Sequence, residues 1–124
     1  MTILSTLARV YVDDLDAALP TFTALTGEQP RLRFAYHELE LAGIGAYLLI
    51  AGTPEALAPY RETHATTIVD DLGEVLTIIT TLGGDILDGP NDVPTGRNLT
   101  VRHPGGARIE YVEFDTAKIE SIPS

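Results

Sequence analysis

Two side chains in this sequence combine a reactive group with a position where a strand is expected. His64 opens the segment HATTIVDDL, and Glu110 lies inside GARIEYVE. An imidazole and a carboxylate can hold a metal ion together, exchange a proton or form an ion pair. The chain contains no cysteine, which excludes disulfides, thiolate nucleophiles and cysteine-bound metals. Any metal would therefore have to be held by His, Asp or Glu.

The segment that His64 opens repeats an earlier part of the chain. Residues 7–27 and 64–84 align without a gap, and the second copy has His64 where the first has Leu7. The identical pairs are Ala8/Ala65, Val12/Val69, Asp13/Asp70, Asp14/Asp71, Leu15/Leu72, Thr23/Thr80, Leu25/Leu82 and Gly27/Gly84. Such an internal repeat predicts that the two halves fold in the same way.

Each copy of the repeat has the pattern of a strand followed by a helix. A short apolar run leads into an Asp-Asp pair, and an amphipathic segment follows and ends at glycine. An Asp side chain accepts hydrogen bonds from the free amides of a first helical turn, and glycine suits the left-handed conformation after the last one. Strand-like segments separated by glycine and proline turns follow each helix; they are RLRFAYHELELAG and GAYLLIAG, then DILDGP, GRNLTVRHP and GARIEYVEF.

The sequence therefore predicts one α+β domain over residues 1–124. Its two β-α-β-β-β modules are expected at roughly 4–52 and 62–115, and residues 53–63 join them with at most one helical turn. Because each helix is amphipathic, it can cover one face of a sheet. We expect the modules to form one curved, barrel-like mixed sheet with both helices outside.

The charge of the chain restricts its partners. The formal net charge is -10, from 18 acidic and 8 basic residues. This field repels phosphate backbones and favours a cationic ligand, although an acidic surface also serves solubility alone. No apolar run approaches the roughly 18 residues that a membrane span needs, and the first residues lack a signal-peptide pattern. We therefore expect no nucleic acid, no membrane association and a cytoplasmic location.

Three segments carry a family resemblance that extends over essentially the whole chain; they are RVYVDDLDAALPTFTALTG, THATTIVDDL and PTGRNLTVRHPGGARIEYVE. Through them, the sequence resembles the vicinal oxygen chelate superfamily of glyoxalase I, bleomycin resistance proteins and extradiol dioxygenases. The resemblance implies that metal-dependent members take four ligands from equivalent strands of the two modules. At those positions this sequence has His64 and Glu110, but also Leu7 and Leu49.

Two remaining ligands are too few for a stable metal site, because catalytic metals are normally held by three or more protein ligands. A third donor such as Glu40 or Tyr47 would have to enter. We therefore expect no bound metal and no cofactor. His64 then either bonds a neighbour at a strand end or pairs with Glu110, since an enclosed carboxylate needs a partner.

Strand alternation extends this candidate site. Ala8, Val10 and Val12 suit packing under a helix, which turns the intervening residues of the first strand to the other face. By the same alternation, Asn98, Thr100 and Arg102 of the seventh strand face the cavity. Either Arg9 or Arg102 could instead be solvated. The candidate ligand-binding residues are His64, Glu110, Leu7, Leu49, Arg9, Tyr11, Tyr47, Thr66, Asn98, Thr100 and Arg102.

This half-apolar ligand set favours a metal-free protein that binds a small organic molecule, similar to the bleomycin resistance branch. The expected ligand has an aromatic or aliphatic body and one polar or cationic end. The alternative is a metal-dependent or acid/base lyase, isomerase or dioxygenase of the glyoxalase type that uses His64 and Glu110. A third possibility is a partner-binding module whose own side chains fill the cavity. The resemblance also implies a homodimer.

Overall fold

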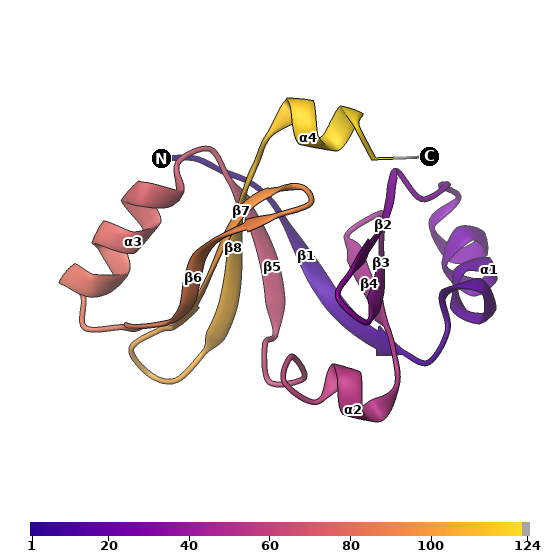
Figure 1. Cartoon of the computed structure of the whole chain (residues 1–124), viewed down its shortest axis with the longest axis horizontal. Coiled ribbons are helices and arrows are strands. Elements are labelled where there is room, and N and C mark those ends of the chain that lie inside the picture. The colour runs from indigo at the N-terminus through magenta and orange to yellow at the C-terminus, as the bar shows by residue number, and fades with distance from the viewer. Residues whose placement is uncertain (123–124) are drawn as a thin grey trace.

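Eight strands form one mixed sheet in the computed structural model, which describes residues 1–122 (Figure 1). The strands are β1 (Ile3–Val12), β2 (Leu32–Tyr36), β3 (Leu39–Ile44), β4 (Tyr47–Ala51), β5 (Ala65–Val69), β6 (Asp85–Val93), β7 (Gly96–Arg102) and β8 (Arg108–Phe114). The helices are α1 (Leu15–Thr26), α2 (Pro54–Leu57), α3 (Leu72–Thr81) and α4 (Thr116–Glu120). The strand order is β2-β3-β4-β1-β5-β8-β7-β6.

This order confirms the two predicted modules and their curved sheet. The first module is β1-α1-β2-β3-β4 and the second is β5-α3-β6-β7-β8, with β1 parallel to β4 and β5 parallel to β8. The modules join where β1 runs antiparallel to β5. Figure 1 shows the two halves of the sheet curving around a shared centre, with α1 and α3 on the outer sides.

The Asp-Asp pairs begin both helices as predicted. The side chain of Asp14 accepts a hydrogen bond from the Asp16 amide at the start of α1, and Asp71 does the same for the Glu74 amide in α3. Gly27 ends α1 in the left-handed conformation, with φ of 70°. The repeat predicts that α3 ends at Gly84, but Gly83, with φ of 88°, is the glycine that directly follows the capping residue. The end of α3 therefore differs from the prediction by one residue.

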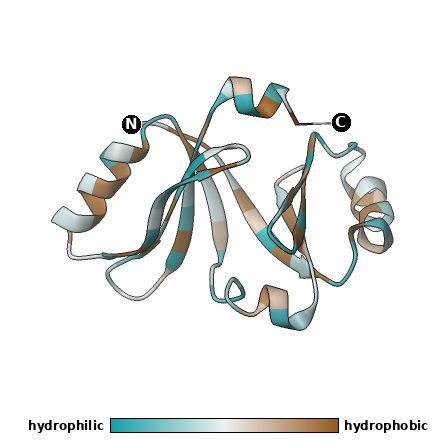
Figure 2. Ribbon diagram, in the orientation of Figure 1, coloured by the Kyte–Doolittle hydropathy of each residue, from teal (hydrophilic) through white to brown (hydrophobic). Residues whose placement is uncertain are grey.

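Apolar side chains lie on both faces of the sheet. On the outer face, Leu15 and Leu19 of α1 pack against Leu49, and Val75 of α3 packs against Leu99. A further buried cluster lies on the inner face of the first module and consists of Leu7, Leu39, Leu41, Leu48, Ile50 and Leu57. Hydrophobic and hydrophilic residues alternate along several strands (Figure 2). The inner face of the first module is therefore an apolar wall.

Two further short helices lie outside the two modules. The connector forms the expected helical turn, α2, which buries Leu57. The last helix, α4, was not predicted; it lies across one open side of the curved sheet (Figure 1). The Nζ atom of Lys118 donates to the carbonyl oxygens of Gly96 at 2.9 Å and Val93 at 3.4 Å, which holds α4 against the β6–β7 turn. Within residues 1–122, no helix is long and apolar enough to cross a membrane.

The start of β1 is tied to the end of β5 by a hydrogen bond that depends on pH. The Thr2 amide donates to Asp70 Oδ1 at 2.6 Å, and this bond is the main reason that the pKa of Asp70 lies below its ordinary value of 3.8. A lowered folded-state pKa adds stability above the unfolded value, and this stability is lost as pH falls through the folded one.

Replacing Asp70 with Asn should therefore reduce stability near neutral pH and progressively less as the pH falls below about 4. Urea unfolding at several pH values measures this difference. Glu38→Gln, an exposed change at the β2–β3 turn, is the control. A stability gap between Asp70→Asn and the wild type that stays constant with pH would contradict the expectation.

Candidate functional site

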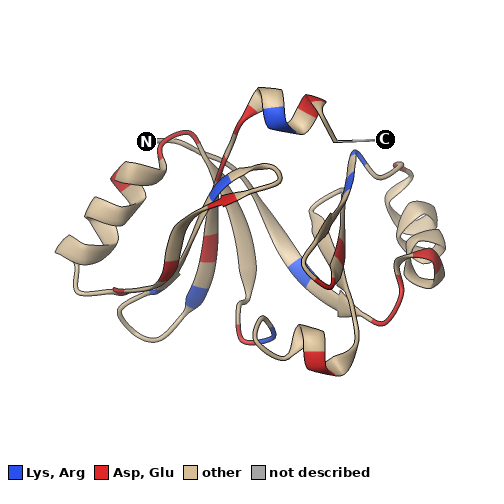
Figure 3. Ribbon diagram, in the orientation of Figure 1, with Lys and Arg blue, Asp and Glu red and all other residues tan. Residues whose placement is uncertain are grey.

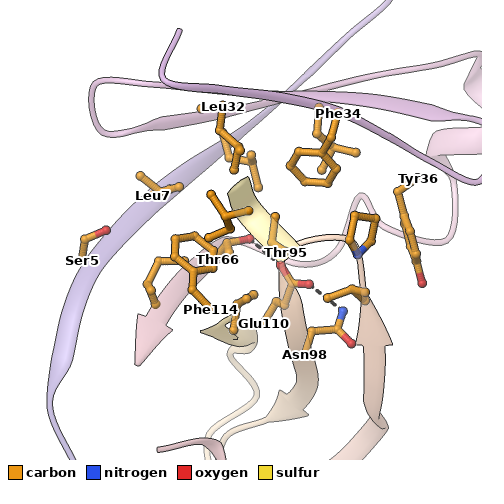
Figure 4. Close-up of a pocket in the computed structure, with 18 of the residues that line it drawn as sticks. Ser5, Leu7, Leu32, Phe34, Tyr36, Thr66, Thr95, Asn98, Glu110 and Phe114 are labelled. Atoms are coloured by element: carbon orange, nitrogen blue, oxygen red, sulfur yellow. Dashed lines mark hydrogen bonds between the residues drawn. The ribbon is translucent and has the colours of Figure 1, made fainter. Parts of the chain in front are cut away.

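A cavity of about 380 Å³ lies on the inner face of the curved sheet, between the two modules. Figure 4 shows side chains of both modules directed into it. The lining residues are Ser5, Leu7, Arg31, Leu32, Phe34, Tyr36, Leu41, Gly43, Leu48, Thr66, Ile68, Val93, Pro94, Thr95, Asn98, Glu110, Val112, Phe114 and Ile119. Most are apolar, and Ile119 comes from α4. We call this space the main cavity.

Strand alternation and register bring the polar groups of the main cavity together. Thr66 of β5 lies opposite Leu7 of β1 and opposite Glu110 of β8. Alternate residues of a strand face the same side of a sheet, so Arg9, two residues after Leu7, shares its inner face. Arg9 and Glu110 therefore lie on the same face of the two strands that flank β5.

Glu110 is the centre of a hydrogen-bonded cluster. Its Oε1 atom accepts from Arg9 Nη2 and from Thr66 Oγ1, each at 2.8 Å, and its Oε2 accepts from Asn98 Nδ2 at 2.8 Å. Figure 4 draws the bonds from Thr66 and Asn98. The side chains of Arg9 and Glu110 are only 7% and 14% exposed. The cluster is a nearly buried ion pair that joins the two modules.

Arg9 is held from three sides. Its Nε donates to Thr66 Oγ1 at 3.0 Å and its Nη1 to the hydroxyl of Tyr11 at 3.2 Å. Burial disfavours the charge of the guanidinium, but Glu110 and Tyr11 more than offset this and raise the pKa of Arg9. The Tyr11 hydroxyl lies within hydrogen-bond distance of the carbonyls of Tyr60 and Thr63, so the connector also positions Arg9.

A second cavity of about 240 Å³ adjoins the first. The two share Tyr36, Leu41, Asn98 and Glu110. The remaining residues that line the second cavity are Arg9, Leu39, Ile50, Pro59, Tyr60, Thr63, Asp88, Thr100 and Arg108. This second cavity is the more polar of the two, so the site has an apolar part and a polar part that meet at Glu110.

Most of the sequence-predicted site residues lie around these two cavities. Leu7, Thr66, Asn98 and Glu110 line the main cavity, while Arg9 and Thr100 line the second one. Tyr11 contacts Arg9 beside the second cavity. Acidic residues are spread over strands, helices and loops of both modules (Figure 3).

Four predicted residues lie elsewhere. His64 is exposed just before β5 and lines neither cavity. Within residues 1–122, the ion pair of Glu110 is made with Arg9 and not with His64. Tyr47 packs on Phe22 of α1, with ring centroids 5.1 Å apart. Arg102 is about half exposed and lies 3.9 Å from Asp85.

The fourth, Leu49, is fully buried on the helix-covered face, and its neighbour Leu48 lines the main cavity instead. The strand pairing explains the difference of one residue. Arg9 lies opposite Leu48, just as Thr66 lies opposite Glu110 in the second module. The sequence alignment matched the glycine-containing turns before β4 and β8. Because these turns differ in length, that alignment is out of register with the strand pairing by one residue. Leu48 is therefore the counterpart of Glu110.

Sequence reasoning missed several residues that line the main cavity. Leu32, Phe34 and Tyr36 of β2 alternate along the strand, and this period of two in RLRFAY could have indicated an inner face. The contribution of Ile119 depends on the position of α4, for which the sequence gives no comparable signal.

The residues at the four metal positions of the resembled superfamily do not fit a divalent ion. These positions hold Leu7, Leu48, His64 and Glu110, and both oxygens of Glu110 already accept hydrogen bonds. Among residues 1–122, no group of three or more His, Asp or Glu side chains is arranged to hold a metal. Two leucines offer no donor atoms, so the set falls below the usual three ligands.

The purified protein should therefore retain well below one equivalent of zinc, nickel, manganese or iron after incubation and desalting. Chelation by EDTA should leave its Tm unchanged, because chelation lowers the Tm only where a metal is bound to the folded state. Elemental analysis and a thermal melt measure both. Stoichiometric metal, or a Tm that falls with EDTA, would overturn this view of the site.

The paired β-α-β-β-β modules and the cavity on their inner face define the vicinal oxygen chelate fold. A Methanosarcina mazei protein described as uncharacterized is 47% identical, with a TM-score of 0.88 over 93% of this chain and 95% of that one. The chain belongs to the same family as that protein.

Methylmalonyl-CoA epimerases share the fold at lower identity. The Mycobacterium tuberculosis epimerase is 18% identical, with a TM-score of 0.75 over 93% of this chain and 91% of its own. A Streptomyces coelicolor epimerase bound to 2-nitronate-propionyl-CoA is 20% identical, with a TM-score of 0.71 over 93% and 97%. No protein-family model and no curated protein sequence matches the chain.

Proposed function

We propose that this protein binds a small organic molecule in the main cavity without a metal ion. The observation that carries the proposal is an apolar space of about 380 Å³ that ends at one hydrogen-bonded polar cluster. Small-molecule sites typically measure roughly 300–1,000 Å³ and combine apolar walls with a few placed polar groups. The apolar walls come from both modules, so a ligand would be enclosed between them.

The walls favour an aromatic or branched aliphatic body. Phe34 and Phe114 come from different modules, and leucines of β1 and β4 contribute to the same lining. Burial of apolar ligand surface against such walls contributes roughly 25 cal/mol per Å² before the losses of binding entropy. The polar end of the ligand would lie toward Glu110 and Asn98.

An acid/base reaction is less well supported by the geometry. A general base needs a free lone pair close to the proton that it removes. Glu110 already accepts three of the roughly four hydrogen bonds that a carboxylate can accept, one of them from a guanidinium, and His64 lies outside both cavities. The similarity to methylmalonyl-CoA epimerases is below 25% identity and concerns the fold. Binding without chemistry is therefore the function that we favour.

A thermal-shift screen of a small-molecule library tests the proposal. A ligand present at 100 times its Kd stabilises the folded state by about 2.7 kcal/mol and raises Tm by several degrees. Hits count only if the shift disappears in Gly43→Phe, a variant whose new side chain occupies the main cavity. A broad library without such hits, or hits that persist in this variant, would contradict the proposal.

We also propose that the protein is a homodimer. Within residues 1–122, the outer strands β2 and β6 each leave one edge unpaired, and such edges are commonly covered by association. Light scattering at micromolar concentration should give a mass near twice 13.3 kDa. A strict monomer at that concentration would contradict this expectation.

A further inference from the structure

The second cavity contains an acid that takes no part in the hydrogen-bonded cluster around Glu110. Asp88 of β6 lines this cavity and is exposed, so a ligand can reach it. Asp88 lies opposite Thr100 of β7, and Thr100 lies opposite Glu110 of β8. Residues that lie opposite one another share a face of the sheet, so two strand spacings, roughly 10 Å, separate the backbones of Asp88 and Glu110 on the inner face.

Asp88 is also the charged residue of this cavity that has no ionic partner among residues 1–122. The other charged residues in the lining are Arg9, Glu110 and Arg108. Arg9 and Glu110 form their own ion pair at 2.8 Å. Arg108 contacts the connector instead, where its Nη1 lies 3.7 Å from a carboxylate oxygen of Glu62. A cation in the second cavity would therefore find its counter-charge at Asp88.

Two tyrosines line the same cavity. Tyr36 comes from β2 and Tyr60 from the connector, and both are partly exposed. Burial is the main reason that the pKa of Tyr36 is raised, and the charges of Asp88 and Glu110 raise it further. The potential at this ring is thus made more negative by both carboxylates. An aromatic face also attracts a cation that lies within about 6 Å of it.

An anionic or a neutral ligand end fits this cavity less well. A carboxylate would lie near two like charges, Asp88 and Glu110, while both guanidinium groups of the lining already contact other carboxylates. A neutral group would gain nothing from the charge of Asp88. The net charge of -10 also attracts cations to the chain as a whole.

We propose that the second cavity binds the cationic end of the ligand, a protonated amine, with Asp88 as its counter-charge and Tyr36 and Tyr60 as aromatic walls. The apolar body of the same ligand lies in the main cavity. The two cavities share Tyr36 and Glu110, so the amine and the body lie on either side of these residues. This inference rests on the proposed binding function and names the class of ligand that it serves.

Three probes with the same apolar body test the charge of the polar end. They are 3-phenylpropylamine, 3-phenylpropan-1-ol and 3-phenylpropanoate, titrated into the wild-type protein by calorimetry or NMR at neutral pH and one ionic strength. The amine should bind about five-fold more tightly than the alcohol, because one exposed ion pair is worth up to roughly that factor. The acid should bind more weakly than the alcohol.

The variant Asp88→Asn removes the charge and keeps the size of the side chain. The amine should then bind about as tightly as the alcohol, and the affinity of the alcohol should stay within about two-fold of its wild-type value. Asp85→Asn is the matched control, because Asp85 is an exposed acid of the same strand that lines neither cavity. It changes the net charge equally and should preserve the advantage of the amine.

Two further measurements need no change at Asp88. Raising the salt concentration from about 0.05 M to about 0.5 M shortens the range of exposed charges, so it should reduce the advantage of the amine over the alcohol. Gly43→Phe should abolish binding of the amine, because the new side chain occupies the place of its apolar body.

An amine that does not bind, or that binds no more tightly than the alcohol, would overturn the inference. An advantage of the amine that persists in Asp88→Asn, is lost equally in Asp85→Asn or does not change with salt would overturn it as well, and so would amine binding that survives Gly43→Phe. The proposed binding function would survive each of these results if library compounds with other polar ends still bind and are excluded by Gly43→Phe.

Discussion

Replacing Glu110 with Ala should lower the free energy of unfolding by about 3–5 kcal/mol, which is the usual loss when one partner of a buried ion pair is removed. The reason is the position of Arg9. Its side chain is 7% exposed and its Nη2 is bonded to Glu110 Oε1 at 2.8 Å. Without the carboxylate, a guanidinium that stays protonated would remain enclosed without a counter-charge. Urea unfolding followed by circular dichroism measures the difference.

The exposed pair of Arg33 and Glu40 provides the matched control. Its atoms lie 3.4 Å apart, and the two side chains are 41% and 57% exposed. Glu40→Ala should therefore lower stability by less than about 1 kcal/mol. Equal losses in Glu110→Ala and Glu40→Ala would show that breaking the buried pair destabilises the protein no more than breaking the exposed one.

A double replacement separates the charge from the packing. Arg9→Met with Glu110→Leu removes both charges and keeps apolar volume between the modules, and it should recover most of the stability that Glu110→Ala loses. If the double variant is as unstable as the single one, the loss arises from the hydrogen bonds to Thr66 and Asn98 rather than from an unpaired charge.

The same ion pair shows what could be predicted from the sequence. The repeat and the helix-capping signals of residues 7–27 and 64–84 predicted both modules and their curved sheet, because they depend on local chemistry and hydrophobic period. Alternation placed Arg9 and Glu110 on the inner face. It could not predict that they meet, because this contact depends on the register of β1 with β5 and of β5 with β8.

His64 and Leu49 show where the alignment of the repeat reached its limit. His64 lies at the position that the repeat assigns to it, but the strand begins one residue later and its side chain is exposed. A shift of one residue reverses the face of a strand residue, which is why Leu48 rather than Leu49 lines the main cavity. Pattern alone fixes the face of a strand residue only when the register is known.

Replacing Gly43 with Phe should abolish ligand binding while preserving the fold. Gly43 lies on β3 between Leu32 of β2 and Leu48 of β4, and it lines the main cavity. A Cβ atom added there would have its nearest neighbours, atoms of Arg31 and Leu32, at 3.9 Å, which is ordinary contact. The position thus accepts a side chain, and a benzyl group would occupy the space that the ligand needs.

The affinity of any ligand of the main cavity should fall by at least about 100-fold, or roughly 2.7 kcal/mol, because the two cannot occupy the same volume. The Tm should stay the same or rise, since a side chain at a compatible glycine restricts the unfolded chain and fills empty space. Gly43→Ala is the graded control: it adds one methyl group and should change affinity only a few-fold. A folded Gly43→Phe protein that binds with wild-type affinity would show that the ligand binds outside the main cavity. If this variant fails to fold, Gly43→Val tests the same expectation with a smaller side chain.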